Sequence, residues 1–227
     1  GGASQLKAVC PICPRHCVLA PGALGACRGR SNVEGRVIST NYGRLTAVAL
    51  DPVEKKPLAR FFPGSSILSV GSYGCNLQCP FCQNAAISMA GPDCRTEFIS
   101  PAALCRLAEE MAAKPPGNIG VAFTYNEPCI SYEYVLDTAK LLKAAGLKTV
   151  LVTNGMICRE PLESLLPYVD AMNIDLKGFS QEYYTWLGGS FATVCETIRL
   201  AAAACHVEVT TLIVPGKNDQ AADMERE

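Results

Sequence analysis

The segment Ser66–Asn84, SILSVGSYGCNLQCPFCQN, joins an apolar run to a loop that carries Cys75, Cys79 and Cys82. The run Ser66–Gly71 has the length and apolar character of a buried strand. Three thiols so close together indicate metal ligation, yet a structural zinc site takes four protein ligands. A [4Fe–4S] cluster also has four irons to ligate, so three thiolates leave one iron open to a small molecule. The segment therefore predicts a strand that ends in an iron–sulfur site with one open position.

After this segment, strands and helices are expected to alternate to the end of the chain. Further strands are expected at Ile119–Phe123, Lys148–Val152, Ala171–Asp175 and His206–Val214. Helices are expected from the capping pair Ser100-Pro101, across Val135–Leu142, at Pro161–Leu166 and across Val194–Cys205. Strands that are separated by helices imply right-handed crossovers and a parallel sheet. The predicted fold class is therefore α/β.

Polar residues follow each of the five expected strands. They are the cysteine loop, Thr124–Glu127, Thr153–Gly155, Asp175 with Lys177, and Pro215–Asp219. Each segment alone is compatible with an ordinary turn. In a parallel α/β sheet or barrel, however, the carboxyl ends of the strands carry the binding site. Five polar segments at the same edge predict a site there.

Residues 1–62 lack this alternation and are expected to form a small, cysteine-rich β module, with residues 63–227 as the α/β part. Strands are expected at Arg36–Thr40 and Leu45–Leu50. Cys10, Cys13, Cys17 and Cys27 follow the pattern C-x2-C-x3-C-x9-C, which suits a closed site for zinc or an auxiliary iron–sulfur cluster. The spacing does not separate these two metals, and His16 is an alternative ligand to its neighbour Cys17.

Composition indicates a soluble globular protein of 227 residues, with 49% hydrophobic residues and a net charge of −1. No stretch approaches the roughly 18 apolar residues of a membrane span, and the start GGASQLK resembles the remnant of a cleaved tag, so a cytoplasmic location is expected. Residues 1–60 hold nine Lys and Arg against three Asp and Glu. This excess predicts a solvated basic face or an approach for an anionic substrate, without the density of a nucleic-acid groove.

Thirteen cysteines in a cytoplasmic protein favour metal ligation over disulfides. Six of them are isolated, and Cys105 and Cys205 lie on apolar helix faces, where a free cysteine acts as a small hydrophobe. Cys129 comes directly after the segment Asn126–Pro128, near the expected site. Among the isolated cysteines, it is therefore the one most expected to contact a substrate. Tyr125, Tyr132 and Trp186 are expected to pack.

The C-x3-C-x2-C loop after the first strand of a β/α repeat resembles the signature of the radical SAM superfamily. Further segments are similar to its pyruvate formate-lyase activating enzyme-like branch, above all to the radical SAM enzyme of the AmmeMemoRadiSam system. They are VALDPVEKKPLARFFPG, FTYNEP, LVTNGMI, NIDLKGFSQEYY and VEVTTLIVPGKND. The resemblance runs from Cys10 to Asp219 and implies a partial (βα)6-type barrel, of which five strands are evident and the sixth is not.

The resemblance also implies roles for individual residues. Cys75, Cys79 and Cys82 would ligate the [4Fe–4S] cluster, and S-adenosylmethionine (SAM) would chelate the fourth iron through its amine and carboxylate. The implied SAM contacts are Phe81 and Val214 at the adenine, Asn126 and Glu127 at the amine, Thr153 and Asn154 at the ribose, and Asp175 and Lys177 at the sugar or the carboxylate. The segment YNEP keeps the carboxylate of the family's GGE motif but not its glycines.

The implied activity is reductive cleavage of SAM to methionine and a 5′-deoxyadenosyl radical, which abstracts hydrogen from a substrate. That substrate would be a glycyl radical enzyme, a small molecule or a peptide, and a flavodoxin or ferredoxin would supply the electron. No nucleic-acid or membrane partner is implied. The alternative is a non-catalytic iron–sulfur or zinc protein, an electron carrier or scaffold, on the same fold.

Overall fold

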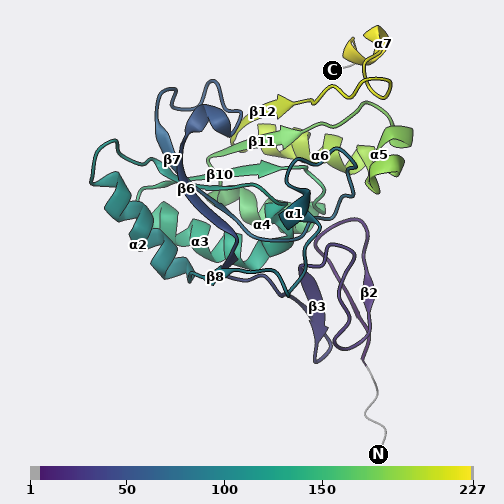
Figure 1. The fold of residues 1–227 in the computed structure, drawn as a ribbon, viewed down its shortest axis with the longest axis horizontal. Helices are drawn as coiled ribbons and strands as arrows, with labels where there is room; N and C mark the ends of the chain where they lie inside the picture. The colour runs from purple at the N-terminus through teal and green to yellow at the C-terminus, as the bar shows by residue number, and fades with distance from the viewer. Residues whose placement is uncertain (1–5, 226–227) are drawn as a thin grey trace, which may run out of the picture.

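The structure is a computed structural model that describes residues 6–225. Most of the tag-like start, Gly1–Gln5, lies outside the described residues. The main sheet has the strand order β12-β11-β10-β9-β7-β6 (Figure 1). Its strands are β6 (Ala47–Pro52), β7 (Ser66–Gly71), β9 (Gly120–Phe123), β10 (Lys148–Thr153), β11 (Ala171–Asp175) and β12 (His206–Thr210). β7 and β9 to β12 run parallel, as expected, and β6 pairs antiparallel with β7.

The helices follow the expected alternation. They are α2 (Pro101–Ala112), α3 (Tyr132–Ala144), α4 (Arg159–Leu165), α5 (Gln181–Leu187) and α6 (Phe191–Ala202), with the short α1 (Ala85–Ser88) and α7 (Ala221–Met224). The predicted cap of α2 is confirmed, because Ser100 Oγ accepts a hydrogen bond from Ala103 N at 3.2 Å. Three 3-10 turns complete the set: η1 (Val53–Lys55), η2 (Pro128–Ser131) and η3 (Leu166–Tyr168).

One expectation about this part of the chain was wrong. The last strand ends at Thr210 rather than Val214, since residues 211–214 have no strand pairing. Helix α5 was not predicted, although its signals are local. Ser180 Oγ accepts a hydrogen bond from Tyr183 N at its start, and Gly188 ends it with a φ of 77°.

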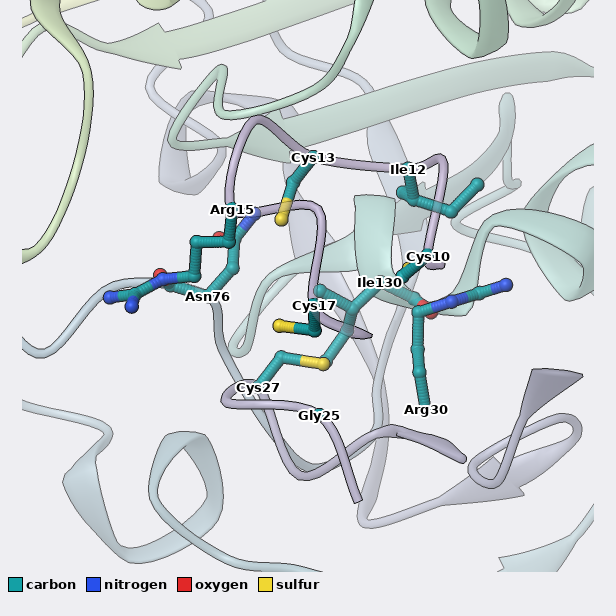
Figure 2. A pocket seen from close by; sticks show the side chains of 10 residues that line it. All are labelled: Cys10, Ile12, Cys13, Arg15, Cys17, Gly25, Cys27, Arg30, Asn76 and Ile130. Carbon is teal, nitrogen blue, oxygen red and sulfur yellow. The ribbon is translucent and has the colours of Figure 1, made fainter. Parts of the chain in front are cut away.

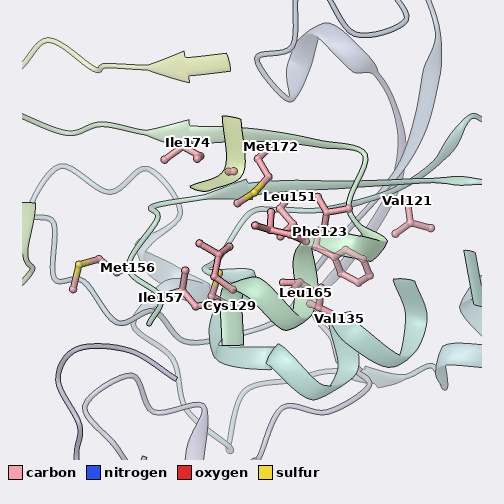
Figure 3. Close-up of a cluster of buried hydrophobic side chains, with 14 of the residues drawn as sticks. Val121, Phe123, Cys129, Val135, Leu151, Met156, Ile157, Leu165, Met172 and Ile174 are labelled. Carbon is pink, nitrogen blue, oxygen red and sulfur yellow. The ribbon is translucent and has the colours of Figure 1, made fainter. Parts of the chain in front are cut away.

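Alternate residues of the central strands pack on opposite faces of the sheet. On one face, Val121, Phe123, Leu151 and Met172 pack with Val135 of α3 (Figure 3). Each fully buried side chain of this kind stabilises the fold by about 1.5–3 kcal/mol. On the other face, Ala122, Val150 and Ala171 pack against the segment after β6, through Val53, Leu58 and Phe61. The sheet is therefore buried on both faces.

Residues 1–62 divide between this sheet and separate small hairpins. The short strands of this segment are β1 (Ala8–Val9), β2 (Val18–Leu19), β3 (Arg30–Val33), β4 (Arg36–Ser39) and β5 (Arg44–Leu45). β5 pairs with β8 (Glu97–Phe98), which lies outside it. Figure 1 shows β2 and β3 (purple) away from the main sheet. The expected strand Leu45–Leu50 corresponds largely to β6, which is the edge strand of the main sheet instead of part of a separate module. The division at residue 62 stays a prediction.

A buried ion pair joins Asp51 of β6 to Lys56, in the following segment that covers one face of the sheet. Lys56 Nζ lies 2.9 Å from Asp51 Oδ2, and Tyr125 OH donates to the same oxygen at 2.8 Å. The Lys56 side chain is only 3% exposed. Burial alone would raise the pKa of Asp51, but its hydrogen bonds to Lys56 and Tyr125 lower the pKa from 3.8 to about 2.

We expect Asp51→Asn to lower the free energy of unfolding by about 3 kcal/mol, because it leaves the buried Lys56 ammonium without its counter-charge. Urea unfolding at neutral pH measures this loss. The wild-type contribution is fully present above the unfolded pKa near 3.8 and is lost as the pH falls through about 2. Between pH 3.8 and about 2, the free energy of unfolding should therefore fall more steeply in the wild type than in the variant. Equal stability of the two proteins at neutral pH would contradict this prediction.

Candidate functional site

The loop that carries Cys75, Cys79 and Cys82 begins where β7 ends. Gly74 has a φ of 89°, and a Cβ there would lie 2.5 Å from the carbonyl oxygen of Cys27, so this turn needs glycine. All three thiols are half-buried. The Cys75 sulfur accepts hydrogen bonds from Leu77 N at 3.4 Å and from Asn154 Nδ2 at 3.6 Å. The loop therefore holds its first thiol beside the end of β10.

Asn126, predicted to contact the amine of SAM, directs its amide at this loop. Its Oδ1 accepts from Ser72 N at 2.8 Å, and its Nδ2 donates to the carbonyl oxygens of Tyr73 at 3.1 Å and Gly74 at 3.0 Å. The side chain is buried. These bonds use both amide protons, so Asn126 fixes the backbone that leads into Cys75. The predicted contact with an amine would have to compete with them.

Glu127 joins the end of β9 to the end of β10. Its carboxylate accepts hydrogen bonds from Thr153 Oγ1 at 2.6 Å, Asn154 N at 2.8 Å and Cys129 N at 2.9 Å. Burial raises the pKa of Glu127 above its usual value, although these hydrogen bonds oppose the rise. Three of the predicted SAM-binding residues are thus in direct contact at one edge of the sheet.

Asp175 and Lys177 form a second group at the end of β11. Lys177 Nζ lies 3.1 Å from Asp175 Oδ2. Burial disfavours the charged form of Lys177, but Asp175 and the neighbouring Cys79 outweigh it and raise the pKa of the amine above its usual value. The ammonium group therefore places a positive charge beside the thiol of Cys79.

The segment after β12 is attached to this second group. Asn218 Nδ2 donates to the carbonyl oxygen of Lys177 at 2.9 Å, and Asn218 Oδ1 accepts from Val214 N at 2.7 Å. Val214, predicted to line the adenine, is half-buried in this turn. Asn218 itself was missed as a site residue, although the sequence PGKND contains it.

Phe81, within the cysteine loop, contacts α5. Its ring centroid is 5.9 Å from that of Trp186, and Lys217 Nζ lies 4.7 Å from the Trp186 ring. Trp186 is 40% exposed, so it packs only in part. Phe81, Trp186 and Lys217 therefore form an aromatic and cationic border next to the cysteine loop.

The four N-terminal cysteines line one pocket together with Asn76 (Figure 2). Figure 2 shows the sulfur atoms of Cys13, Cys17 and Cys27 pointing into the space between their loops. Within residues 6–225, no group of three or more His, Cys, Asp or Glu side chains is arranged to hold a metal ion. Asn76 was also missed by the sequence analysis; its position between Cys75 and Leu77 was the available signal.

The donor set of the Cys75 loop fits an iron–sulfur cluster. Three thiols on one loop, N–H donors on a sulfur atom and a nearby ammonium group are the features that hold and tune such a cluster. Burial raises the pKa of the Cys75 thiol to about 12, and the carboxylate of Glu127 adds to the rise. A metal that binds there must therefore displace a tightly held proton.

Comparison with known proteins identifies the family. Residues 69–226 match the profile of the Radical SAM superfamily. An uncharacterized protein of Methanocaldococcus jannaschii is 39% identical over 220 residues, which cover 96% of this chain and 64% of that protein. A pyruvate formate-lyase-activating enzyme of Clostridium pasteurianum is 27% identical over 147 residues, 61% of this chain and 60% of that enzyme. The chain thus spans less than two thirds of the length of either relative.

The fold is also found in a solved structure, that of Streptococcus suis SuiB bound to the precursor peptide SuiA. The TM-score is 0.52 at 16% identity, over 77% of this chain and 37% of that chain. No helix within residues 6–225 is both long and apolar enough to cross a membrane. The superfamily profile covers most of the sequence and includes the three-cysteine loop. The chain therefore belongs to the radical SAM superfamily of enzymes.

Proposed function

We propose that this protein cleaves SAM reductively on a [4Fe–4S] cluster held by Cys75, Cys79 and Cys82. When bound, the reduced cluster and SAM supply the chemistry: one electron breaks a sulfonium C–S bond, giving methionine and a 5′-deoxyadenosyl radical that takes hydrogen from a substrate. The observation that carries this proposal is the three-thiol loop at the end of β7, where Cys75 accepts a hydrogen bond from Asn154 and Cys79 lies near the charge of Lys177. Three thiolates leave one iron open for SAM.

The residues around the loop have separate tasks in this proposal. Glu127 and the Asp175–Lys177 pair would bind the charged amine and carboxylate of SAM, since they carry the matching charges. Thr153 and Asn154 would contact the ribose, while Phe81 and Val214 would pack on the adenine. Asn126 would act through the loop, because its amide already binds the backbone of residues 72–74.

Two substrate classes follow from the family. The similarity to the Clostridium activating enzyme supports a glycyl radical enzyme as the protein partner. A small molecule or peptide is the second class. A glycyl radical detected on a partner protein by electron paramagnetic resonance (EPR) would support the first class, and turnover without any such partner would support the second. A low-potential donor such as flavodoxin or ferredoxin would supply the electron.

We also propose that Cys10, Cys13, Cys17 and Cys27 hold a second metal group, zinc or iron–sulfur. The support is their shared pocket, which four thiols line from two loops of the N-terminal hairpins (Figure 2). Closed sites of four thiolates are typical of both metal types.

The proposed activity is tested with anaerobic protein whose iron–sulfur content has been reconstituted. After reduction with dithionite, incubation with SAM should release 5′-deoxyadenosine and methionine, measured by chromatography. An intact cluster that forms neither product would contradict the proposal and favour the non-catalytic alternative, an electron carrier or scaffold. A protein denatured after reconstitution is the control for chemical breakdown of SAM.

A further inference from the structure

Helix α5 carries a buried phenol group whose hydroxyl is unpaired. Tyr183 is 8% exposed, and its hydroxyl is enclosed with no hydrogen-bond partner within residues 6–225. Close packing holds the ring in place: a Cβ at Gly178 would overlap it, and Trp186 meets it edge-on with the ring centroids 5.5 Å apart. A buried hydroxyl of this kind requires an acceptor.

The unpaired hydroxyl lies near the second thiol of the cysteine loop. Tyr183 and Cys79 belong to the same packed cluster of side chains. Burial raises the pKa of Tyr183, a thiolate at Cys79 raises it further, and the Lys177 ammonium opposes the rise. The effect of a charge falls with distance, so both groups are neighbours of the phenol.

Helix α5 contacts the cysteine loop at two further points. Gln78 N donates to the carbonyl oxygen of Leu187 at 2.9 Å, and Phe81 packs against Trp186 with the ring centroids 5.9 Å apart. Gln78 directly precedes Cys79 in the loop, and Phe81 follows it by two residues. Contacts on both sides of Cys79 hold the helix against this part of the loop, so the phenol keeps its position relative to the thiol.

A sulfur atom that carries negative charge would be the acceptor that the hydroxyl lacks. In a [4Fe–4S] cluster, hydrogen bonds to the sulfur atoms are among the factors that set the reduction potential. Such bonds raise the potential, because they stabilise the reduced form, which carries one more negative charge than the oxidised form. Hydrogen bonds to charged acceptors are also about twice as strong as those between neutral groups. The phenol stays protonated in both forms of the cluster.

We propose that Tyr183 donates a hydrogen bond to the cluster at its Cys79 corner and so raises the reduction potential of that cluster. This inference rests on the cluster of the proposed function, but not on cleavage of SAM. The hydroxyl would make the cluster easier for its electron donor to reduce. All of the tests measure potential and stability without SAM, so they are independent of the proposed activity.

The first test measures the reduction potential of reconstituted wild type and Tyr183→Phe by anaerobic titration followed by EPR. Loss of the hydroxyl should lower the equilibrium constant for reduction about tenfold, which for one electron is a potential lower by about 59 mV. Tyr134→Phe is the matched control, because this buried hydroxyl of α3 donates to the carbonyl oxygen of Ile99, and it should keep the wild-type potential. Equal potentials in wild type and Tyr183→Phe would overturn the proposal, as would an equal shift in both variants.

The second test uses the metal-free proteins and separates this role from a structural one. The Tyr183 hydroxyl has no partner among the described residues, so its removal should leave the free energy of unfolding in urea unchanged or raise it. Tyr134→Phe loses a hydrogen bond and should be less stable than the wild type. A metal-free Tyr183→Phe protein that is less stable than the wild type would show that the hydroxyl binds the protein itself, and would overturn the proposal.

The two proposals fail in different ways. A wild-type protein that assembles no cluster would overturn the assignment of the cysteine loop, and this inference with it. A cluster that forms in both proteins with the same potential would overturn only the role of Tyr183.

Discussion

Cys75→Ala is expected to reduce 5′-deoxyadenosine formation by more than about 100-fold, because even residues that only support a metal ligand affect metal affinity or activity by 10–100-fold. Cys75 is the thiol most integrated into the site: its sulfur accepts hydrogen bonds from Leu77 N and Asn154 Nδ2. Removing it leaves only two of the three proposed thiolate ligands. It also leaves the N–H groups of Leu77 and Asn154 without their acceptor. Product formation and iron content, measured on the same reconstituted samples, check this prediction.

Cys105→Ala is the matched control for that experiment. Cys105 is buried on α2, among the hydrophobic side chains that pack on the sheet, where a thiol acts as a small apolar group. Its loss should leave iron content and product formation at the wild-type level. A Cys75→Ala protein that makes product at the wild-type rate would show that this thiol is not a ligand, and the assignment of the loop would then be wrong.

The parallel sheet could be predicted from the sequence because its strands are short, apolar and separated by helices with clear signals. Ser100-Pro101 shows this well: a capping hydroxyl and a proline at the first helical position specify a helix start in any context. The strand that was misplaced, β6, has no such context. Its pairing with β7 depends on contacts across the chain, and the alternation within Ala47–Pro52 does not say which sheet it joins.

For part of the candidate site, the sequence predicted which residues lie close together. It did not predict the contacts that each of them makes. Glu127, Thr153 and Asn154 were expected at one edge of the sheet, and hydrogen bonds join them there. The direction of the Asn126 amide, toward residues 72–74, could not be predicted, because a side chain that follows a strand can face either a ligand or a loop. Asn76 was missed because its partners are distant in sequence: Arg15 lies in the first N-terminal loop and Asn154 directly follows β10.

Of the substitutions that add one methyl group at a glycine, Gly120→Ala is expected to cause the largest loss of stability. Gly120 begins β9 opposite Lys148 of β10, and Lys148 N donates to the carbonyl oxygen of Ile119 at 2.8 Å. A Cβ at Gly120 would overlap the backbone carbonyl oxygen of Lys148 and lie 2.6 Å from its backbone nitrogen. Backbone atoms in the middle of a parallel sheet cannot rotate away as a flexible side chain can.

The two strands must therefore separate, and overpacking of this kind costs about 3 kcal/mol. In a domain of this size, that loss lowers the melting temperature by roughly 6–12 °C. Gly91→Ala is the control, because its added methyl would meet only the Cβ of Arg28, at an ordinary 3.8 Å, and its melting temperature should not change. Gly120 lies at the opposite end of β9 from Glu127, so the folded variant should still bind iron at low temperature. If Gly120→Ala and the wild type had the same melting temperature, β9 and β10 would not be paired in this register.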